Sequence, residues 1–191
     1  MNQILAVVIA YLVGSVSFGV LVARAQGFDI YTVGSGNPGM SNVMRTLGKR
    51  SAALVLVGDA AKGVIAAAVG VSLVDPLFGY VALLAAVVGH AFPVWHRFRG
   101  GKGVATTLGG LVFIAPLTGI ALAVVWVVFL VVWKTASIGS LTAMVLMVPF
   151  LAMTGRRGVE LAWAGAIAVF VVARHTSNIR RLLTTSERKV L

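Results

Sequence analysis

Long stretches without charge constrain the fold of this chain more than any other feature. No charged side chain occurs from Met1 to Ala23, and none occurs over the 31 positions from Gly103 to Trp133. About 20 consecutive apolar residues are enough for a helix to cross the hydrocarbon core of a bilayer. Charged residues make up only 11% of the 191 positions, whereas soluble domains carry about 25%. We therefore predict an all-α membrane protein with no separate soluble domain.

The run over 103–133 is too long for one span. At about 1.5 Å per residue, such a helix would exceed the roughly 30 Å hydrocarbon core. Pro116 lies inside the run, where proline breaks or kinks a helix. We therefore predict a short helix over 104–114 and a longer one over 117–133. The other predicted spans make seven in all, at 1–23, 51–74, 76–96, 137–154 and 159–174.

The distribution of basic residues predicts how these spans are oriented. The net charge is +11, and Lys and Arg are concentrated on the cytoplasmic side of membrane proteins. With seven spans and the N-terminus outside, 13 basic residues fall inside and 2 outside, against 9 and 6 if 103–133 is one span. We therefore expect an external N-terminus, a cytoplasmic C-terminus and one membrane domain over 1–191. The excess positive charge favours contact with anionic lipid over nucleic acid.

Three polar segments, at 26–50, 96–103 and 174–191, share the predicted cytoplasmic side. The first contains GSGNPG at 34–39, followed by Arg45. Asn37 followed by Pro38 predicts a helix N-cap and first helical position. Glycines before a helix start let backbone N–H groups converge on an anion. The segment is therefore either a phosphate-binding loop or a tight glycine-rich turn.

The second segment, GHAFPVWHRFRGGKG at 89–103, places two glycines and Lys102 just before a helix expected near Val104. A lysine in such a loop suits a phosphate group. The loop is not a P-loop, because the GxxxxGK[ST] spacing is absent. The alternative is that Arg97, Arg99 and Lys102 only anchor the chain at the membrane surface.

The third segment, RHTSNIRRL at 174–182, contains a histidine and an asparagine. If the last span continues as a helix, His175 and Asn178 lie close to each other on its surface. We interpret Arg180 and Arg181 as lipid-headgroup anchors.

Ionisable residues also occur inside the predicted spans. Asp59 and Lys62 are three residues apart and can pair on a helix. Such a pair either supports a site or only neutralises itself. His90 precedes the basic loop, and Ser137 and Ser140 open the sixth span at the same level.

These motifs resemble the bacterial acyl-phosphate:glycerol-3-phosphate acyltransferases of the PlsY type. The similarity covers nearly the whole chain through GSGNPGxxNxxR at 34–45, DxxKG at 59–63, GHxFPVxxxFRGGKGVAT at 89–106 and RHxxNIxRL at 174–182. Three positions depart from the family pattern. Met40 and Ser41 replace the usual Ala-Thr, and Thr185 stands where the family tends to have glycine, two residues before Glu187.

The resemblance implies transfer of a fatty acyl group from acyl-phosphate to the 1-hydroxyl of glycerol 3-phosphate in the bacterial cytoplasmic (inner) membrane. It implies no cofactor, no metal and no nucleic acid, with the bilayer and an enzyme that makes acyl-phosphate as partners. The alternative from a different class is a transporter of phosphate or phosphate esters. With the loop chemistry, the resemblance assigns catalytic roles to Ser35, Asn37, His90, Lys102 and His175; phosphate binding to Gly36, Gly39, Arg45, Gly100, Gly101, Lys102, Ser140, His175 and Asn178; and support to Asn42, Asp59 and Lys62.

Overall fold

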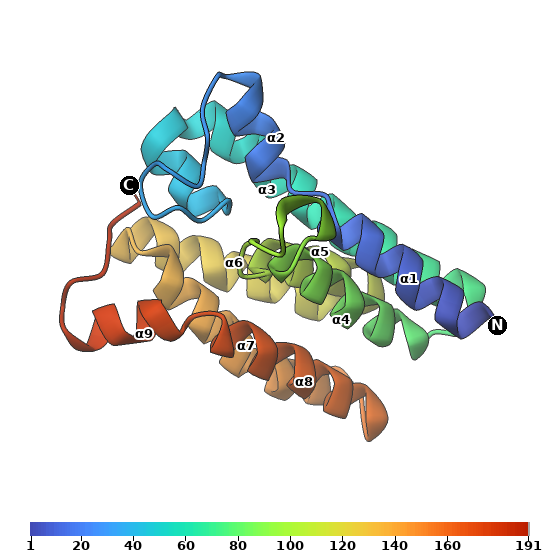
Figure 1. The fold of residues 1–191 in the computed structure, drawn as a ribbon. Helices are drawn as coiled ribbons and strands as arrows, with labels where there is room; N and C mark the ends of the chain where they lie inside the picture. Colours follow the sequence, from blue (N-terminus) through green and yellow to red (C-terminus); the bar gives the residue numbers. More distant parts are fainter. Residues whose placement is uncertain (191) are drawn as a thin grey trace.

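The computed structural model describes residues 1–190, and the elements in this range are all helical. Figure 1 shows the helices as a bundle in which α1 runs beside α3, and α7 beside α8. In chain order the elements are α1 (Asn2–Ser15), α2 (Phe18–Ala25), α3 (Met40–Leu73), α4 (Phe78–Ala91), η1 (Val94–His96), α5 (Val104–Ile114), α6 (Pro116–Trp133), α7 (Ala136–Met153), α8 (Val159–Ala173) and α9 (Thr176–Leu183).

The helices support the membrane assignment. Five helical segments are long and apolar enough to cross a bilayer, or six if α8 and α9, which meet at 60°, form one broken span. The predicted division at Pro116 is confirmed, because α5 ends at Ile114 and α6 begins at Pro116. Since α5 is shorter than a full span, the total of seven and the orientation of the termini stay predictions.

Two predicted segments differ from the structure. The first span is broken at Val16 and Ser17, where the backbone becomes extended between α1 and α2. The second was predicted to begin at 51, but α3 already starts at Met40 and bends at Gly48, whose φ is +83°. Glycine adopts this left-handed conformation without the steric cost of a side chain. The polar segment before residue 51 is therefore partly helical.

Small residues let the helices approach closely. A side chain on Gly14 of α1 would overlap the backbone of Ala86 in α4, and one on Gly109 of α5 would overlap the backbone of Ala60 in α3. Such contacts are common between membrane helices, where packing rather than the hydrophobic effect drives association. The packing fixes the relative positions of the helix ends that surround the pocket described next.

Candidate active site

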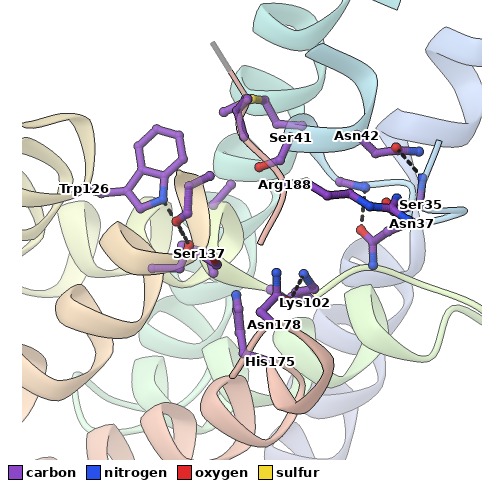
Figure 2. A pocket seen from close by; sticks show the side chains of 18 of the residues that line it. Ser35, Asn37, Ser41, Asn42, Lys102, Trp126, Ser137, His175, Asn178 and Arg188 are labelled. Atoms are coloured by element: carbon purple, nitrogen blue, oxygen red, sulfur yellow. Dashed lines mark hydrogen bonds between the residues drawn. The ribbon is translucent and has the colours of Figure 1, made fainter. Parts of the chain in front are cut away.

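A cavity lies where the starts of α3, α5 and α7 meet α9 and the C-terminal tail. Its volume is about 1120 Å³, with open space at the mouth included. Figure 2 shows polar side chains from both glycine-rich loops facing it. Of the residues singled out from the sequence, the wall includes Ser35, Asn37, Gly39, Asn42, Arg45, Asp59, His90, Lys102, Ser137, Ser140, His175 and Asn178.

The first glycine-rich loop is held in place by Asn42. Its side-chain oxygen accepts a hydrogen bond of 2.8 Å from the Ser35 N–H, and its Nδ2 donates to the Val33 carbonyl at 3.1 Å. Asn42 is buried within the first turn of α3. It therefore fixes the loop that presents Ser35 to the pocket.

The predicted start of α3 was wrong. Asn37 is not the N-cap and Pro38 is not the first helical residue, because the cap is Gly39 and the helix begins at Met40. The Asn37 side chain instead accepts a 2.9 Å hydrogen bond from the Gly39 N–H, which makes a local turn before the helix. The error is a shift of two residues, and both Asn37 and Gly39 still reach the pocket wall.

The second loop packs against His90. The His90 carbonyl accepts a 3.1 Å hydrogen bond from the Gly101 N–H. A side chain on Gly101 would overlap the His90 ring, and one on Gly100 would overlap the His90 carbonyl. Only glycine therefore fits at these two positions, and the tight turn brings Lys102 to the pocket immediately before α5 begins at Val104.

Tyr31 joins the two loops outside the pocket. Its hydroxyl donates a 2.6 Å hydrogen bond to the Arg99 carbonyl, and the Arg99 guanidinium lies 4.7 Å from the centre of the Tyr31 ring. The predicted membrane anchor Arg99 is thus also a contact between the loops.

Lys102 is the cation most clearly directed into the pocket. Its ammonium donates a hydrogen bond to the Asn178 side-chain oxygen, as Figure 2 shows. Burial is the main cause that lowers the pKa of Lys102 to about 8; Glu187 opposes this shift, and nearby Arg181 and Arg45 contribute to it. The ammonium is still charged at pH 7, and it would be stabilised by an anion bound in the pocket.

His175 faces the same cavity with a defined tautomer. Its Nδ1 lies 2.7 Å from the Val171 carbonyl, which can only accept, so Nδ1 carries the proton. Burial, followed by the charge of Lys102, lowers the pKa of His175 to about 4. The ring is therefore neutral at pH 7, and its Nε2 is a hydrogen-bond acceptor.

The expected helical continuation through this segment was wrong. The last span ends at Ala173, His175 is the N-cap of α9, and the two helix axes meet at 60°. His175 and Asn178 are three residues apart at the start of α9, and the bend before this helix brings them to the pocket together.

Sequence reasoning missed the contribution of the C-terminal tail. The Glu187 carboxylate accepts hydrogen bonds from Ser137, Asn178 and Arg181. Burial tends to raise the pKa of Glu187, but these hydrogen bonds outweigh it and the pKa lies below its ordinary value. The Val190 N–H then donates to the Lys134 carbonyl at 2.7 Å, so the tail crosses from α9 to the end of α6. A sequence signal existed, because Glu187 is the only acid after Glu160.

The interpretation of Arg181 as a lipid anchor was wrong. Its Nε lies 2.7 Å from Glu187 Oε2, and it lines the pocket with Arg188. Arg180, in contrast, is exposed on α9, as expected for an anchor. The spacing of two adjacent arginines does not reveal which of them turns inward.

Part of the pocket wall is apolar. Ser140 donates to the Ala136 carbonyl within α7 and accepts a 3.1 Å hydrogen bond from the Trp126 indole. The apolar lining residues include Leu56, Val104, Leu108, Trp126 and Ala136. The cavity therefore combines cationic and apolar lining.

The remaining predicted site residues lie behind the wall. Lys62, Gly36, Gly100 and Gly101 are not among its lining residues in the described part of the chain. The N–H groups of Gly36, Gly39 and Gly101 already donate to Val33, Asn37 and His90 respectively. These glycines shape the two loops, and their role as direct phosphate donors stays a prediction.

The whole chain matches known proteins. The family model described as glycerol-3-phosphate acyltransferase matches residues 4–185. A glycerol-3-phosphate acyltransferase of Neisseria meningitidis serogroup B is 44% identical over an alignment covering 100% of this chain and 98% of that protein. One from Geotalea daltonii is 42% identical, with 97% and 96% covered.

Two solved structures share the fold. A crystal structure of PlsY (YgiH), an integral membrane glycerol 3-phosphate acyltransferase, in its glycerol 3-phosphate form has a TM-score of 0.93 and 37% identity, covering 99% of this chain and 96% of that chain. The lysophosphatidic acid form has a TM-score of 0.90 and 38% identity, covering 99% and 95%.

Proposed function

Since the chain belongs to the glycerol-3-phosphate acyltransferase family, we propose that it transfers a fatty acyl group from acyl-phosphate to the 1-hydroxyl of glycerol 3-phosphate. The products would be lysophosphatidic acid and inorganic phosphate. Family membership establishes an integral membrane acyltransferase, and the choice of donor is our inference. Family membership also favours an enzyme over the phosphate or phosphate-ester transporter that was the alternative from the sequence.

One observation carries the choice of donor, namely the charge balance of the pocket. Four basic residues line it, Arg45, Lys102, Arg181 and Arg188, against two acids, Asp59 and Glu187. Asp59 already pairs with Lys62 behind the wall at 2.9 Å, so the lining cations exceed the uncompensated acid. Two phosphate-bearing substrates, acyl-phosphate and glycerol 3-phosphate, match this excess, and the apolar lining residues suit a fatty acyl chain.

The reaction proposed here needs no covalent enzyme intermediate. Acyl-phosphate is a mixed anhydride, so the substrate hydroxyl oxygen attacks the carbonyl carbon directly. The bond from that carbon to the phosphate oxygen breaks, and phosphate leaves with the electron pair. In this proposal Lys102 and Arg45 hold the phosphates and stabilise the developing negative charge, and Ser35, Asn37, Ser140 and Asn178 orient the substrates by hydrogen bonding.

The hydroxyl proton requires an acceptor, and we propose a substrate phosphate. A phosphate monoester has its second pKa near 6, as phosphoserine does, so a dianionic oxygen is available at pH 7. His175 is neutral with Nε2 as an acceptor, and it would orient the hydroxyl rather than remove its proton. His90 has the same orienting role in this scheme.

The donor can be tested with purified protein in detergent or nanodiscs. Acyl-phosphate and glycerol 3-phosphate should yield lysophosphatidic acid, while acyl-CoA and acyl carrier protein, which lack phosphate at the carbonyl, should be poor donors. Efficient turnover with acyl-CoA would exclude the proposed donor. Loss of the acidic limb of the pH profile of kcat/KM in His90→Gln or His175→Gln would identify that histidine as the base.

The proposed membrane orientation is also testable. We propose a single domain over 1–191 with seven spans in the bacterial cytoplasmic membrane, the N-terminus outside and the pocket facing the cytosol, where a peripheral enzyme could supply acyl-phosphate. Because the chain has no cysteine, single cysteines at Arg99, Lys189 and Arg157 can be probed on intact cells with an impermeant thiol reagent. Only the one at Arg157 should react, and labelling at either of the others would contradict the orientation.

A further inference from the structure

A buried charged cluster borders the pocket, and two of its members, Asp59 and Lys62, have no role in the proposed reaction. Asp59 and Lys62 of α3 and His90 of α4 are 3%, 2% and 8% exposed. Asp59 Oδ1 lies 2.9 Å from Lys62 Nζ and 3.6 Å from His90 Nδ1. Removing charges from water is costly even for a pair, so apolar residues would fill this space with less penalty.

Lys62 is connected to the first glycine-rich loop through the break between α1 and α2. Its ammonium donates a 2.8 Å hydrogen bond to the Val16 carbonyl, at the break between α1 and α2. Carbonyl groups at a helix end lack intrahelical partners, so Lys62 satisfies one and fixes the break. After the break, Gly19 of α2 lies directly against the Pro38 carbonyl of the GSGNPG loop, where a larger side chain would overlap it.

Asp59 reaches from the same cluster to the second loop. Its carboxylate faces the Nδ1 edge of the His90 ring, and Gly101 lies against Nε2 of that ring. The His90 carbonyl also holds the Gly101 N–H. Lys102 follows Gly101 directly, so the orientation of His90 determines where the ammonium enters the pocket.

We propose that Asp59 and Lys62 are positioning residues that hold the two glycine-rich loops at a fixed separation across the pocket. Lys62 acts on residues 34–39 through Val16 and α2, and Asp59 acts on residues 100–102 through His90. The ionic pair is retained at a site in the bilayer because its directional contacts set two loops at once. The kinetic part of this inference rests on the proposed function, whereas the placement of the loops does not.

The chain offers a matched control elsewhere in the bundle. Arg156 lies 2.8 Å from Glu160, four residues further along the chain, and donates a 2.9 Å hydrogen bond to the Ile114 carbonyl, at the break between α5 and α6. This cluster has the same construction but contacts neither glycine-rich loop. Its removal therefore reports the effect of losing such a cluster without an effect on the pocket.

Hydrogen exchange of backbone amides tests the effect of Lys62 on the first loop and that of Asp59 on the second loop separately, and it does not depend on the reaction. Asp59→Asn retains the hydrogen bond from Lys62 to the Val16 carbonyl. Amide exchange at 97–103 should therefore rise about tenfold, while exchange at 31–39 stays unchanged. Asp59→Asn with Lys62→Met removes both charges together, which avoids leaving one buried and unpaired, and should raise exchange in both loops. Arg156→Met with Glu160→Gln should affect neither loop. Unchanged exchange in both loops of the double variant would overturn the proposal.

Kinetics then test the link to Lys102. With the donor that the wild type uses, Asp59→Asn should lower kcat/KM about tenfold, and adding it to Lys102→Ala should cost less than about threefold more, because both changes remove the same contact. Fully multiplicative losses would show that Asp59 acts independently of Lys102 and would also overturn the proposal. Failure of acyl-phosphate as donor would appear in the wild type and leave the exchange result intact.

Discussion

Two clusters of similar construction, one bordering the pocket and one at the opposite end of the bundle, differ in what they serve. In each, a cation bridges a carboxylate three or four residues away and the carbonyl of a broken helix: Lys62 with Asp59 and Val16, and Arg156 with Glu160 and Ile114. The first is buried, whereas the Arg156 and Glu160 side chains are 34% and 27% exposed.

The surroundings account for the difference. At the pocket, α2 and α4 lead into the two glycine-rich loops, and Lys102 of the second loop and Arg45 of α3 line the cavity. At the far end Arg156 is engaged by its own carboxylate and carbonyl, and Thr118 pairs with Thr154 at 3.1 Å. Charged residues in a membrane helix therefore indicate a site only when neighbouring loops bring further polar groups to one cavity.

The largest predicted effect comes from removing a pocket cation. Lys102→Ala or Arg45→Ala should cost a charge-assisted contact worth about 1.5–3 kcal/mol, which lowers kcat/KM roughly ten- to a hundredfold. Arg157→Ala at the far end and Arg180→Ala, exposed on α9, should retain nearly full activity in the same assay. A larger loss of kcat/KM in Arg180→Ala than in Lys102→Ala would show that the proposed phosphate site is wrong.

The next effect concerns the glycine that supports Lys102. Gly101→Ala would press a methyl group into the His90 ring, and such overpacking costs about 1–3 kcal/mol. We expect at least several-fold lower kcat/KM and a lower thermal midpoint. Gly165→Ala is the control, because the nearest atom to its new methyl group lies 4.0 Å away in the middle of α8. It should retain activity and gain stability, since alanine favours helix by about 0.5–1 kcal/mol over glycine. Equal losses in both variants would mean that His90 and Gly101 do not set the position of Lys102.

The sequence allowed prediction of features that depend on local chemistry. Uncharged runs located the membrane helices, Pro116 located the boundary between α5 and α6, and the i, i+3 spacing of Asp59 and Lys62 predicted their pairing, which is confirmed at 2.9 Å. Each of these depends on residues within a few helical turns. They were therefore visible without knowledge of the fold.

Features that depend on tertiary contacts were missed. The break at Val16 is stabilised by Lys62, 46 residues further along the chain, and no proline marks it. The bend before α9 turns Arg181 into the pocket, where Glu187 holds it, whereas the sequence suggested an exposed arginine pair. Both errors arose because a distant side chain decides a local conformation.

A smaller effect should appear in the pH dependence of kcat/KM, through the charge of Lys102 in the pocket. Because the pKa of Lys102 lies at about 8, below its ordinary value, the ammonium loses its proton as the pH rises through 8. One pH unit above the pKa only about a tenth remains charged, so kcat/KM should fall along a basic limb near pH 8. A substrate phosphate with its second pKa near 6 is already dianionic there. In Lys102→Arg the limb should move to higher pH, and an unchanged limb would assign it to another group.

The smallest predicted effect compares the helix ends that follow α7 and α9. Both have the same pattern of hydrogen bonds, from Gly155 N to Ala152 O and Arg156 N to Leu151 O, and from Thr185 N to Leu182 O and Ser186 N to Arg181 O. This termination places one residue in the left-handed region, usually glycine. Gly155 has φ +89° there, but Thr185 has φ +52°, which costs a β-branched residue about 1–2 kcal/mol.

Thr185→Gly should therefore relieve strain at the start of the tail that carries Glu187. The gain should stay below about 1 kcal/mol, because glycine also gains entropy in the unfolded chain. It should appear as slower amide exchange at Ser186, with kcat/KM unchanged within about twofold. Gly155→Thr is the reciprocal change and should destabilise the end of α7 without affecting the pocket. If Thr185→Gly instead accelerates exchange at Ser186, the threonine contributes contacts that outweigh its strain, and the two helix ends are not equivalent.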